Sequence, residues 1–309
     1  MPKRDFLSLS DFSREELDAL LLRAIELKEE RSSNVIHNSL AGKTGLLILA
    51  QNSTRTRIAF EAGMNQLGGH SIFLSDRDSQ ASRGEPLEDF ARVVSEMADV
   101  VMTRQPEQKR IELLAKHASI PVINGMSSDL HPCQLLADMQ TFLELKGSIE
   151  GRSVAFIGDG FNMCNSYIEA SEIFQFKLNI ASPEGFAPAP SFIERSSNVE
   201  LYSSAEDAVN GVDLVVTDVW SSMGQTDKDT DKADLFQPYQ VNEQLLELSD
   251  KEAIFMHCLP AHRGEEISAG LLDHKKSGVW QEAGNRLHTQ KALLEFLLKP
   301  MCTQQESAF

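Results

Sequence analysis

The sequence predicts an α/β protein with two domains, each containing a parallel β-sheet, and a cleft between them. A chain of 309 residues is long enough for about two domains of roughly 150 residues each. Short apolar runs alternate along it with segments of helical periodicity, which is the pattern of parallel strands joined by helices. The alternation starts afresh near residue 150, after one long helical segment. We therefore expect one sheet before that point and a second sheet after it.

The first half begins with a helix and continues as an alternating series. Leucines recur at helical spacing from 13 to 30, and Ser13 with Glu16 forms a capping-box pattern. The run GLLILA at 45–50 is short, apolar and bounded by turn residues, which is typical of a buried parallel strand. The remaining strands are expected at 71–75, 100–104 and 121–126, and the remaining helices at 58–69, 88–97 and 109–118.

A long helix expected at 131–145 and ending at Gly147 connects this series to the second one. The second series has strands expected at 153–159, 177–182, 213–220 and 253–260, and helices at 162–174 and 205–210. Strands and helices again alternate, so the second sheet is also expected to be parallel.

The chain ends in an amphipathic segment at 288–298 that has no strand after it. Such a helix usually packs on whichever domain has an open face. The polar segment 224–237 is expected to be a mobile loop. We place the two domains at 1–135 and 150–287, with 136–149 as the linking helix.

The composition excludes several classes of protein. Asp and Glu number 46 against 29 Lys and Arg, a formal net charge of −17, so neither nucleic acid nor an anionic membrane is an expected partner. No apolar run approaches the ~18 residues of a membrane span, and the four cysteines form no CxxC pair. We expect a cytoplasmic protein with reduced thiols, in which an anionic ligand requires locally concentrated positive charge.

The segment STRTR at 53–57 directly follows the first predicted strand and opens a helix. Free backbone N–H groups and the positive end of the helix dipole favour an anion at such a place. Its hydroxyl and guanidinium groups add the donors that a phosphate needs. Each residue alone is more simply a helix cap or a solvated arginine. The five together predict a phosphate site, although the glycines and lysine of a Walker P-loop are missing.

The tetrapeptide HPCQ at 131–134 also opens a helix, with its proline in the first turn. His131 is either a capping residue or a hydrogen-bond donor to a carbonyl oxygen. Gln134 offers an amide group nearby.

The second half carries a Gly-Asp-Gly turn around Asp159. It resembles a dinucleotide fingerprint, but Met163 stands where the third glycine is needed. Asn162, just after the turn, is expected at the carboxyl edge of the second sheet, where such folds bind ligands.

Three more residues lie at the ends of predicted elements. Asp218 follows a strand and suits the ammonium group of an amino-acid ligand, or else caps a turn. Cys258 ends another strand as a nucleophile, a hydrogen-bond partner or an inert hydrophobe. Arg286 precedes the last predicted helix and is either a second anion contact or a surface arginine.

Together these segments resemble the carbamoyltransferase family, and within it the ornithine branch. The matching segments are STRTR at 53–57, HPCQ at 131–134, DVWSSMG at 218–224, HCLPAHRGEE at 257–266 and NRLHTQKALL at 285–294. They occur in the family order and span nearly the whole chain. The first two mark the wider family, whereas the SMG loop and HCLP mark the ornithine branch.

The resemblance implies a reaction and a set of site residues. The carbamoyl group of carbamoyl phosphate would pass to the δ-amine of L-ornithine, giving L-citrulline and phosphate, with no metal and no cofactor. Residues implied to bind carbamoyl phosphate are Ser53, Thr54, Arg55, Thr56, Gln80, Arg104, His131, Gln134, Leu259 and Arg286. Those implied to bind ornithine are Asn162, Asp218, Ser222 and Met223, and those implied to be catalytic are Arg104, His131 and Cys258.

The same resemblance implies how the chain is organised and assembled. The first domain would bind carbamoyl phosphate and the second ornithine, with the C-terminal segment 288–309 returning to the first. Similar enzymes are homotrimers, and Gln80 stands where a loop reaches the neighbouring active site. The positive charge for the phosphate is expected from Arg55, Arg57, Arg104 and Arg286.

Other functions are weighed against this one. A carbamoyltransferase for putrescine or an acylated ornithine shares most motifs, although the SSMG segment at 221–224 favours ornithine. A catalytically silent homologue has no need of the intact motifs, and the incomplete glycine turn weakens a nicotinamide-dependent dehydrogenase. Phe161, Gln281 and Gly284 differ from residues common in the family and are expected near the ornithine side and Arg286.

Overall fold

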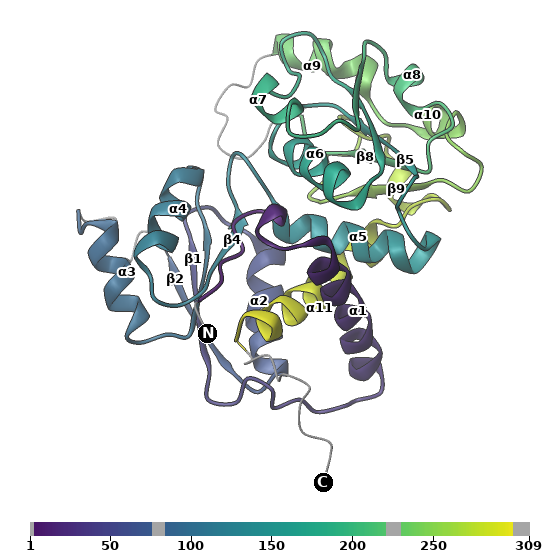
Figure 1. Cartoon of the computed structure of the whole chain (residues 1–309). Helices are drawn as coiled ribbons and strands as arrows, with labels where there is room; N and C mark the ends of the chain where they lie inside the picture. Colours follow the sequence, from purple (N-terminus) through teal and green to yellow (C-terminus); the bar gives the residue numbers. More distant parts are fainter. Residues whose placement is uncertain (1–2, 76–83, 221–229, 299–309) are drawn as a thin grey trace.

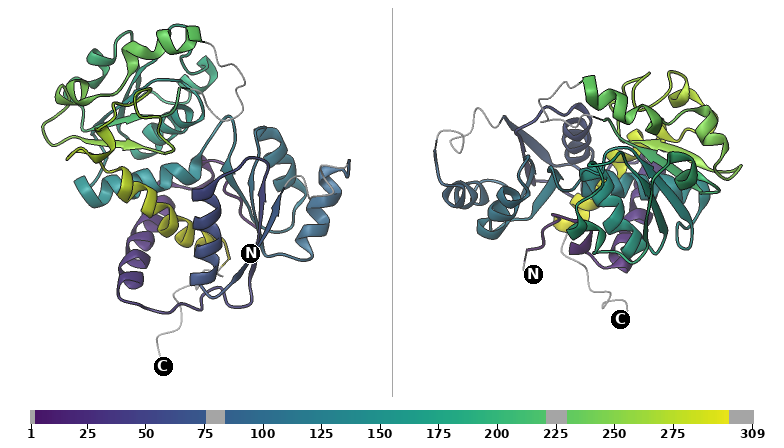
Figure 2. Two further views of the ribbon diagram at one scale, coloured as in Figure 1. Left: turned by 180° about the vertical axis from the view of Figure 1, so that it is seen from behind. Right: turned by 90° about the horizontal axis from the view of Figure 1, so that it is seen from above.

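The structure is a computed structural model that describes residues 3–75, 84–220 and 230–298. Over these residues it contains two parallel β-sheets surrounded by helices, which confirms the predicted α/β class. Figure 1 shows the sheets in two separate lobes, and the views in Figure 2 show the same division from behind and from above.

The first sheet follows the predicted series closely. It consists of β1 (Thr44–Leu49), β2 (His70–Ser75), β3 (Val100–Arg104) and β4 (Val122–Met126), in the order β2-β1-β3-β4. The helices of this lobe are α1 (Arg14–Ser32), α2 (Thr54–Gln66), α3 (Leu87–Ser95) and α4 (Gln108–His117). The capping box at the start of α1 is present, because Ser13 accepts a hydrogen bond from the Glu16 amide. Helix α2 begins at Thr54, so the predicted phosphate segment forms its first turn.

The second sheet is parallel throughout. It consists of β5 (Ser153–Ile157), β6 (Lys177–Ala181), β7 (Val199–Tyr202), β8 (Leu214–Thr217) and β9 (Ile254–His257), in the order β7-β6-β5-β8-β9. The helices of this lobe are α6 (Asn162–Phe174), α7 (Pro190–Ile193), α8 (Ala205–Val209), α9 (Thr230–Phe236) and α10 (Glu243–Glu247). Short 3₁₀ turns lie at Leu9–Asp11, Gln237–Tyr239 and Leu271–Asp273. The central strand β5 is buried from Val154 onward, as expected for a strand covered on both faces.

Helix α5 (Pro132–Lys146) lies between the lobes, and α11 (Val279–Leu298) runs from beside α5 into the first lobe. The C-terminal helix α11, yellow in Figures 1 and 2, packs on α1, α2 and α5, so it returns to the first lobe as predicted. One apolar cluster extends from Leu47 of β1 through Leu136 and Phe142 of α5 to Phe156 of β5. The two lobes therefore share a continuous core along α5.

The sequence prediction missed strand β7 and helices α7, α9 and α10 of the second lobe. Strand β7 is a short edge strand whose side chains are all half-buried or exposed, so it gives no apolar signal. Helix α9 shows that the mobile loop expected at 224–237 is wrong for its second half. Phe236 at the end of α9 is fully buried, with ring centroids 4.8 Å from Phe186 and 5.7 Å from Trp220. The rest of that segment, 224–229, lies outside the described residues.

The last helix is longer than predicted. It begins at Val279 rather than at 288. The prediction missed this start because the first turns bury polar side chains and lack the apolar periodicity of an ordinary amphipathic helix. The boundary placed between 287 and 288 thus falls inside α11, and the one between 135 and 136 falls inside α5. Among the helices of the described ranges, none is long and apolar enough to cross a membrane.

Candidate active site

A pocket lies where the carboxyl ends of strands from both sheets face each other. Its empty space is about 490 Å³, part of it open to solvent. It is lined by Ser53, Arg55, Thr56, Arg104, Met126, His131, Asn162, Met163, Asp218, Val219, Cys258, Leu259, Pro260 and Arg286. Ten of these are residues predicted from the sequence, contributed by segments far apart in the chain. The edge of a parallel sheet at which they meet is the usual ligand edge of such folds.

The N-terminus of α2 forms one wall of the pocket. Ser53 caps this helix by accepting a hydrogen bond from the Thr56 amide at 3.3 Å. Free backbone N–H groups of the first turn, including that of Thr54, lie at the positive end of the helix dipole. Arg55 extends from the same turn and donates a hydrogen bond to the Leu259 carbonyl oxygen across the pocket. This wall is therefore suited to an anion.

Arg57 does not belong to this wall, although it was a candidate for anion binding. Its Nε donates to Glu61 Oε1 at 2.9 Å, one helical turn along α2, and its guanidinium lies 3.8 Å from the centre of the Phe73 ring. The helical period explains the difference, because residues two apart on a helix point in different directions.

Two buried arginines stand beside the α2 terminus. Arg104, at the end of β3, is 4% exposed, and Arg286 of α11 is 2% exposed. Burial, together with the charge of Arg286, lowers the pKa of Arg104 to about 10, so its guanidinium remains charged at neutral pH. Within the described residues, the buried Nε of Arg104 has no hydrogen-bond partner. A buried charged group with an unpaired N–H is unfavourable, so an anion that accepts from Arg104 would stabilise it.

Arg286 is held in place by neutral partners. Its Nη1 donates to Gln134 Oε1 at 2.6 Å and its Nη2 to Thr56 Oγ1 at 3.2 Å. Nε of Arg286 donates to Gln290 Oε1 at 3.3 Å. Gln134 thus lies behind Arg286 and does not line the pocket itself.

His131 occupies the N-cap position of α5 and lines the pocket. Its backbone N–H donates to Ser166 Oγ at 2.7 Å, and its Nδ1 is buried with no partner among the described residues. Burial, followed by the charges of the neighbouring arginines, holds the pKa of His131 well below its usual range. The imidazole is therefore neutral, with one N–H available to donate to a carbonyl oxygen.

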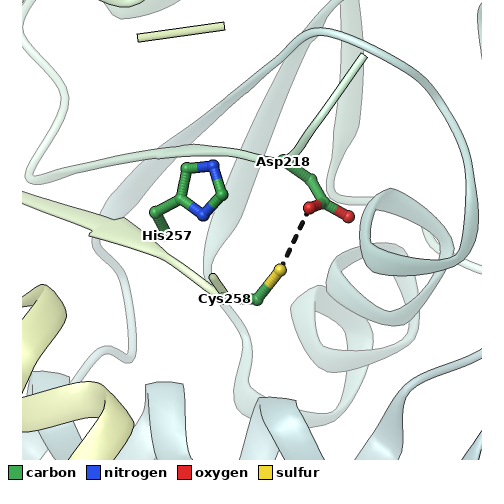
Figure 3. A group of neighbouring side chains, drawn as sticks. All are labelled: Asp218, His257 and Cys258. Carbon is green, nitrogen blue, oxygen red and sulfur yellow. Dashed lines mark hydrogen bonds between the residues drawn. The ribbon is translucent and has the colours of Figure 1, made fainter. Parts of the chain in front are cut away.

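The opposite wall carries a thiol and a carboxylate. Figure 3 shows Cys258 Sγ directed at Asp218 Oδ1, to which it donates a hydrogen bond at 3.1 Å. Burial, and then the charge of Asp218, raise the pKa of Cys258 well above its usual range. Because the thiolate is the nucleophilic form, this cysteine is a hydrogen-bond donor and not a nucleophile in the structure.

His257 lies beside this pair (Figure 3), and the ligand atoms of Asp218, His257 and Cys258 are close enough to share a metal ion. The imidazole is already engaged on both sides. Its Nδ1 accepts from the Leu259 amide at 2.9 Å, and its Nε2 donates to the Glu266 carboxylate at 3.1 Å. A second such group, His262, Glu265 and Glu266, lies outside the pocket lining.

The backbone at Leu259 is adapted to the pocket. Leu259 has φ +56°, a left-handed conformation that is uncommon for a residue with a side chain. Its N–H binds His257 while its carbonyl oxygen accepts from Arg55, so the conformation presents the carbonyl to the α2 wall.

The remaining predicted residues are placed as follows. Asn162, at the start of α6, lines the pocket and donates through Nδ2 to the Ser127 carbonyl at 2.8 Å. Gln80, Ser222 and Met223 lie outside the described residues. Phe161, Gln281 and Gly284 do not line the pocket; Gln281 instead donates to Glu144 at 2.5 Å.

Comparison with known proteins gives the fold and pocket a family. Two family models match, covering almost the whole chain: the aspartate/ornithine carbamoyltransferase carbamoyl-P binding domain over residues 4–144, and the Asp/Orn binding domain over 150–297. The chain belongs to the aspartate/ornithine carbamoyltransferase family. The first sheet lies within the first matched region and the second sheet within the second.

Members of this family are similar to the chain over nearly their full length. An ornithine carbamoyltransferase of Acinetobacter baumannii is 55% identical over 299 residues, covering 96% of this chain and 98% of that protein. One from Hydrogenovibrio crunogenus is 52% identical, covering 96% and 99%. Among solved structures, ornithine carbamoyltransferase from Pyrococcus furiosus has a TM-score of 0.90 at 40% identity, covering 96% and 97%. The Burkholderia thailandensis enzyme has a TM-score of 0.89 at 43% identity, covering 96% and 98%.

Two buried carboxyl groups beneath Arg286 were not identified from the sequence. Asp138 accepts from Gln134, four residues earlier on α5, and Glu282 accepts from the same amide group. The four-residue spacing was a usable signal for Asp138. Glu282 gave no such signal, because the sequence prediction placed it before the last helix and not inside it.

Proposed function

We propose that the protein transfers the carbamoyl group of carbamoyl phosphate to the δ-amine of L-ornithine, giving L-citrulline and phosphate. The observation that carries this proposal is the division of charge across one pocket. Arg55, Arg104 and Arg286 stand on one side, and Asp218 with its hydrogen-bonded thiol stands on the other. A phosphorylated anion and a cationic amino acid would each meet the opposite charge.

The phosphate is assigned to the N-terminus of α2. Ser53, Thr54, Arg55 and Thr56 offer hydroxyls, a guanidinium and free backbone N–H groups at one place. The departing phosphate gains negative charge as the bond to the carbamoyl group breaks. The fixed arginines would neutralise that charge without reorganising.

The carbamoyl group is assigned to the centre of the pocket. Thr56, Arg104 and the neutral imidazole of His131 would polarise its oxygen, which becomes an oxyanion when the amine attacks. The Leu259 carbonyl oxygen would accept from the carbamoyl NH₂. Gln134 would act through Arg286, whose guanidinium it contacts.

Ornithine is assigned to the wall formed after β5 and β8. Asp218 would pair with the α-amino group, and Asn162, Ser222 and Met223 would complete this side. The Cys258 thiol, donating to Asp218, would orient that carboxylate. The attacking δ-amine must be neutral, so the rate should rise toward alkaline pH. A rate that does not change from neutral pH upward would contradict this step.

One assay tests the reaction. The protein is incubated with carbamoyl phosphate and, in separate reactions, ornithine, putrescine, aspartate or acetylornithine, and phosphate release is measured. We expect turnover with ornithine. Turnover restricted to putrescine or acetylornithine would support the alternative of another amine substrate, and turnover with aspartate alone or with none would overturn the proposal.

We further propose a cytoplasmic homotrimer whose active sites are completed by Gln80 of a neighbouring subunit. The support is the resemblance of the chain to its family. Sedimentation equilibrium measures the mass of the assembly. If Gln80 acts across subunits, mixing inactive Gln80→Ala and Arg286→Ala subunits under dissociating conditions restores activity, because some sites then receive two intact contributions.

A further inference from the structure

The carboxyl groups of Asp138 and Glu282 form a buried pair beneath Arg286. Both residues are 1% exposed. Nε2 of Gln134 donates to Asp138 Oδ1 at 2.9 Å and to Glu282 Oε1 at 2.8 Å, so one amide nitrogen bridges the two acids. Neither residue lines the pocket.

The pair connects four elements of the fold. The second oxygen of Asp138 accepts from the Tyr167 hydroxyl of α6 at 2.8 Å. The second oxygen of Glu282 accepts from the His257 backbone N–H, at the end of β9, at 3.0 Å. Helices α5, α6 and α11 and strand β9 therefore meet at these two acids, and β9 leads directly into the Leu259 carbonyl that faces the pocket.

The pair also determines which end of the Gln134 amide faces Arg286. Both N–H bonds of Gln134 are used by the acids, so only its Oε1 is left for the guanidinium, which it meets at 2.6 Å. A reversed amide would place two donors against each other at Arg286 and two acceptors against each other at the acids. Arg286 is thus held in its pocket position through the pair.

Charge balance requires a proton in this group. The titratable and charged side chains facing the two acids are Tyr167 of α6, Cys258 after β9 and Arg286 of α11. Burial raises the pKa of both Tyr167 and Cys258, so these two remain neutral. Two carboxylates would then face one buried guanidinium, which leaves an uncompensated buried negative charge.

The surroundings of the two acids favour a neutral form. Burial, and next the charge of Asp138, raise the pKa of Glu282 well above its usual range. Burial also raises the pKa of Asp138, although hydrogen bonds from Gln134, Tyr167 and Glu282 favour its charged form. Two groups in such contact titrate as one unit, so the proton belongs to the pair.

We propose that Glu282 is a positioning residue that shares one proton with Asp138, and that this singly protonated pair holds Gln134, and through it Arg286, in the carbamoyl phosphate pocket. The proton lies between the two carboxyl groups while Glu282 Oε2 accepts from the His257 amide. The effect on carbamoyl phosphate rests on the proposed function, whereas the protonation state does not.

Three variants test the positioning role by the KM for carbamoyl phosphate and kcat. Glu282→Gln keeps a donor toward Asp138 and an acceptor for the His257 amide and loses only the acceptor for Gln134, so KM should rise by about fivefold. Glu282→Leu removes both and should raise KM more than about 30-fold, since it leaves buried polar groups unpaired. Glu144→Gln is the matched control, because Glu144 also joins α5 to α11 but through Asn285 and Gln281, away from the pocket. Its KM should stay within about twofold of wild type.

The pH dependence separates positioning from simple packing. In wild type, loss of the shared proton at alkaline pH would place two carboxylates together, so KM for carbamoyl phosphate should rise there. Glu282→Gln has no such proton to lose, and its KM should change less over the same range. Equal KM values for Glu282→Gln and Glu282→Leu, or identical pH profiles for Glu282→Gln and wild type, would overturn the positioning role.

An infrared spectrum tests the proton without any turnover. The wild-type minus Glu282→Gln difference spectrum at about pH 8 should contain the carbonyl stretch of a neutral carboxylic acid. Absence of that band overturns the shared proton. If wild type fails to use carbamoyl phosphate, the proposed function falls while the infrared result still decides the proton. Circular dichroism of each variant confirms that it has folded.

Discussion

The two walls of the pocket hold their charges in different ways. Arg104 and Arg286 are buried, and Arg286 is held by three neutral side chains from α2, α5 and α11. The other wall has a single half-buried carboxylate, Asp218, which accepts from the Cys258 thiol and from the Val219 amide at 2.8 Å. The positive wall is thus built into the packing between helices, whereas the negative wall depends on one side chain at the end of a strand.

This difference has consequences for binding. Arginines that are already fixed in position can bind an anion without reorganisation, so the full interaction is available when the anion arrives. Asp218 already accepts hydrogen bonds from a thiol and an amide. A substitution that keeps an acceptor oxygen there leaves these donors paired and should therefore have a smaller effect. We therefore expect substitutions in the positive wall to have the larger effects.

The largest effect is expected from the charge at the α2 terminus. Arg55→Ala should lower kcat/KM for carbamoyl phosphate about 1,000-fold, because it removes a charged donor directed into the pocket. Isothermal titration calorimetry with carbamoyl phosphate checks whether binding is lost, and circular dichroism checks that the fold is intact.

Arg57→Ala is the matched control on the same helix. Arg57 pairs with Glu61 on the surface, and such exposed pairs contribute little, so its kcat/KM should stay within about threefold of wild type. Near-normal turnover of Arg55→Ala, or equal losses in both variants, would sink the assignment of the phosphate to this wall.

The negative wall is tested by removing only charge. Asp218→Asn keeps an oxygen that accepts from Cys258 and Val219, but not the charge that would meet an ammonium group. We expect kcat/KM for ornithine to fall about 100-fold, with the affinity for carbamoyl phosphate changed less than about threefold. Steady-state kinetics with each substrate varied in turn gives both numbers.

The control lies at the other end of the same strand. Asp213 precedes β8 and pairs with Arg152 at 3.0 Å, and neither residue lines the pocket. Asp213→Asn should leave both kinetic constants near those of wild type. If Asp218→Asn weakens carbamoyl phosphate as strongly as ornithine, the two walls do not divide the substrates as proposed.

The sequence predicted the residues of the positive wall better than the buried residues that hold them in place. STRTR and HPCQ each open a helix after a strand, so their motifs and their placement at the sheet edge agree, and the structure places Ser53, Arg55 and His131 in one pocket. The helical period alone could have predicted that Arg57 and Arg55 point in different directions. Periodicity could not predict the start of α11, because the polar residues Glu282 and Asn285 are buried by partners from α5.

Similar limits explain the misses in the second lobe. Helix α9 is held by one buried aromatic residue, Phe236, within a polar segment, and the packing of Phe186 and Trp220 around it is tertiary information. Strand β7 pairs with β6 through its backbone, so its side chains carry little signal. The fold class was readable because buried central strands, such as β5 from Val154 onward, are apolar.

The smallest expected effect is on the pH dependence of stability. It compares a buried histidine in the pocket with a buried histidine outside it. His131 lies in the pocket and His288 lies outside it on α11, and burial lowers the pKa of both, that of His288 to about 4. Between about pH 6.5 and about pH 4 the unfolded chain binds a proton that folded His288 does not, so stability present above this window is lost as pH falls through it.

Removing either imidazole should therefore flatten the fall in stability with acid, but only one should affect turnover. His288→Gln should reduce the slope of unfolding free energy against pH by at most about 1.4 kcal/mol per pH unit, with kcat near that of wild type. His131→Gln should reduce the slope similarly and also lower kcat, because it removes a donor to the carbamoyl oxygen. Urea unfolding at one protein concentration across this window gives the slopes. An unchanged slope in His288→Gln would show that this imidazole does not contribute to the pH dependence of stability. A loss of kcat in His288→Gln equal to that of His131→Gln would show that its effect is not separate from the active site.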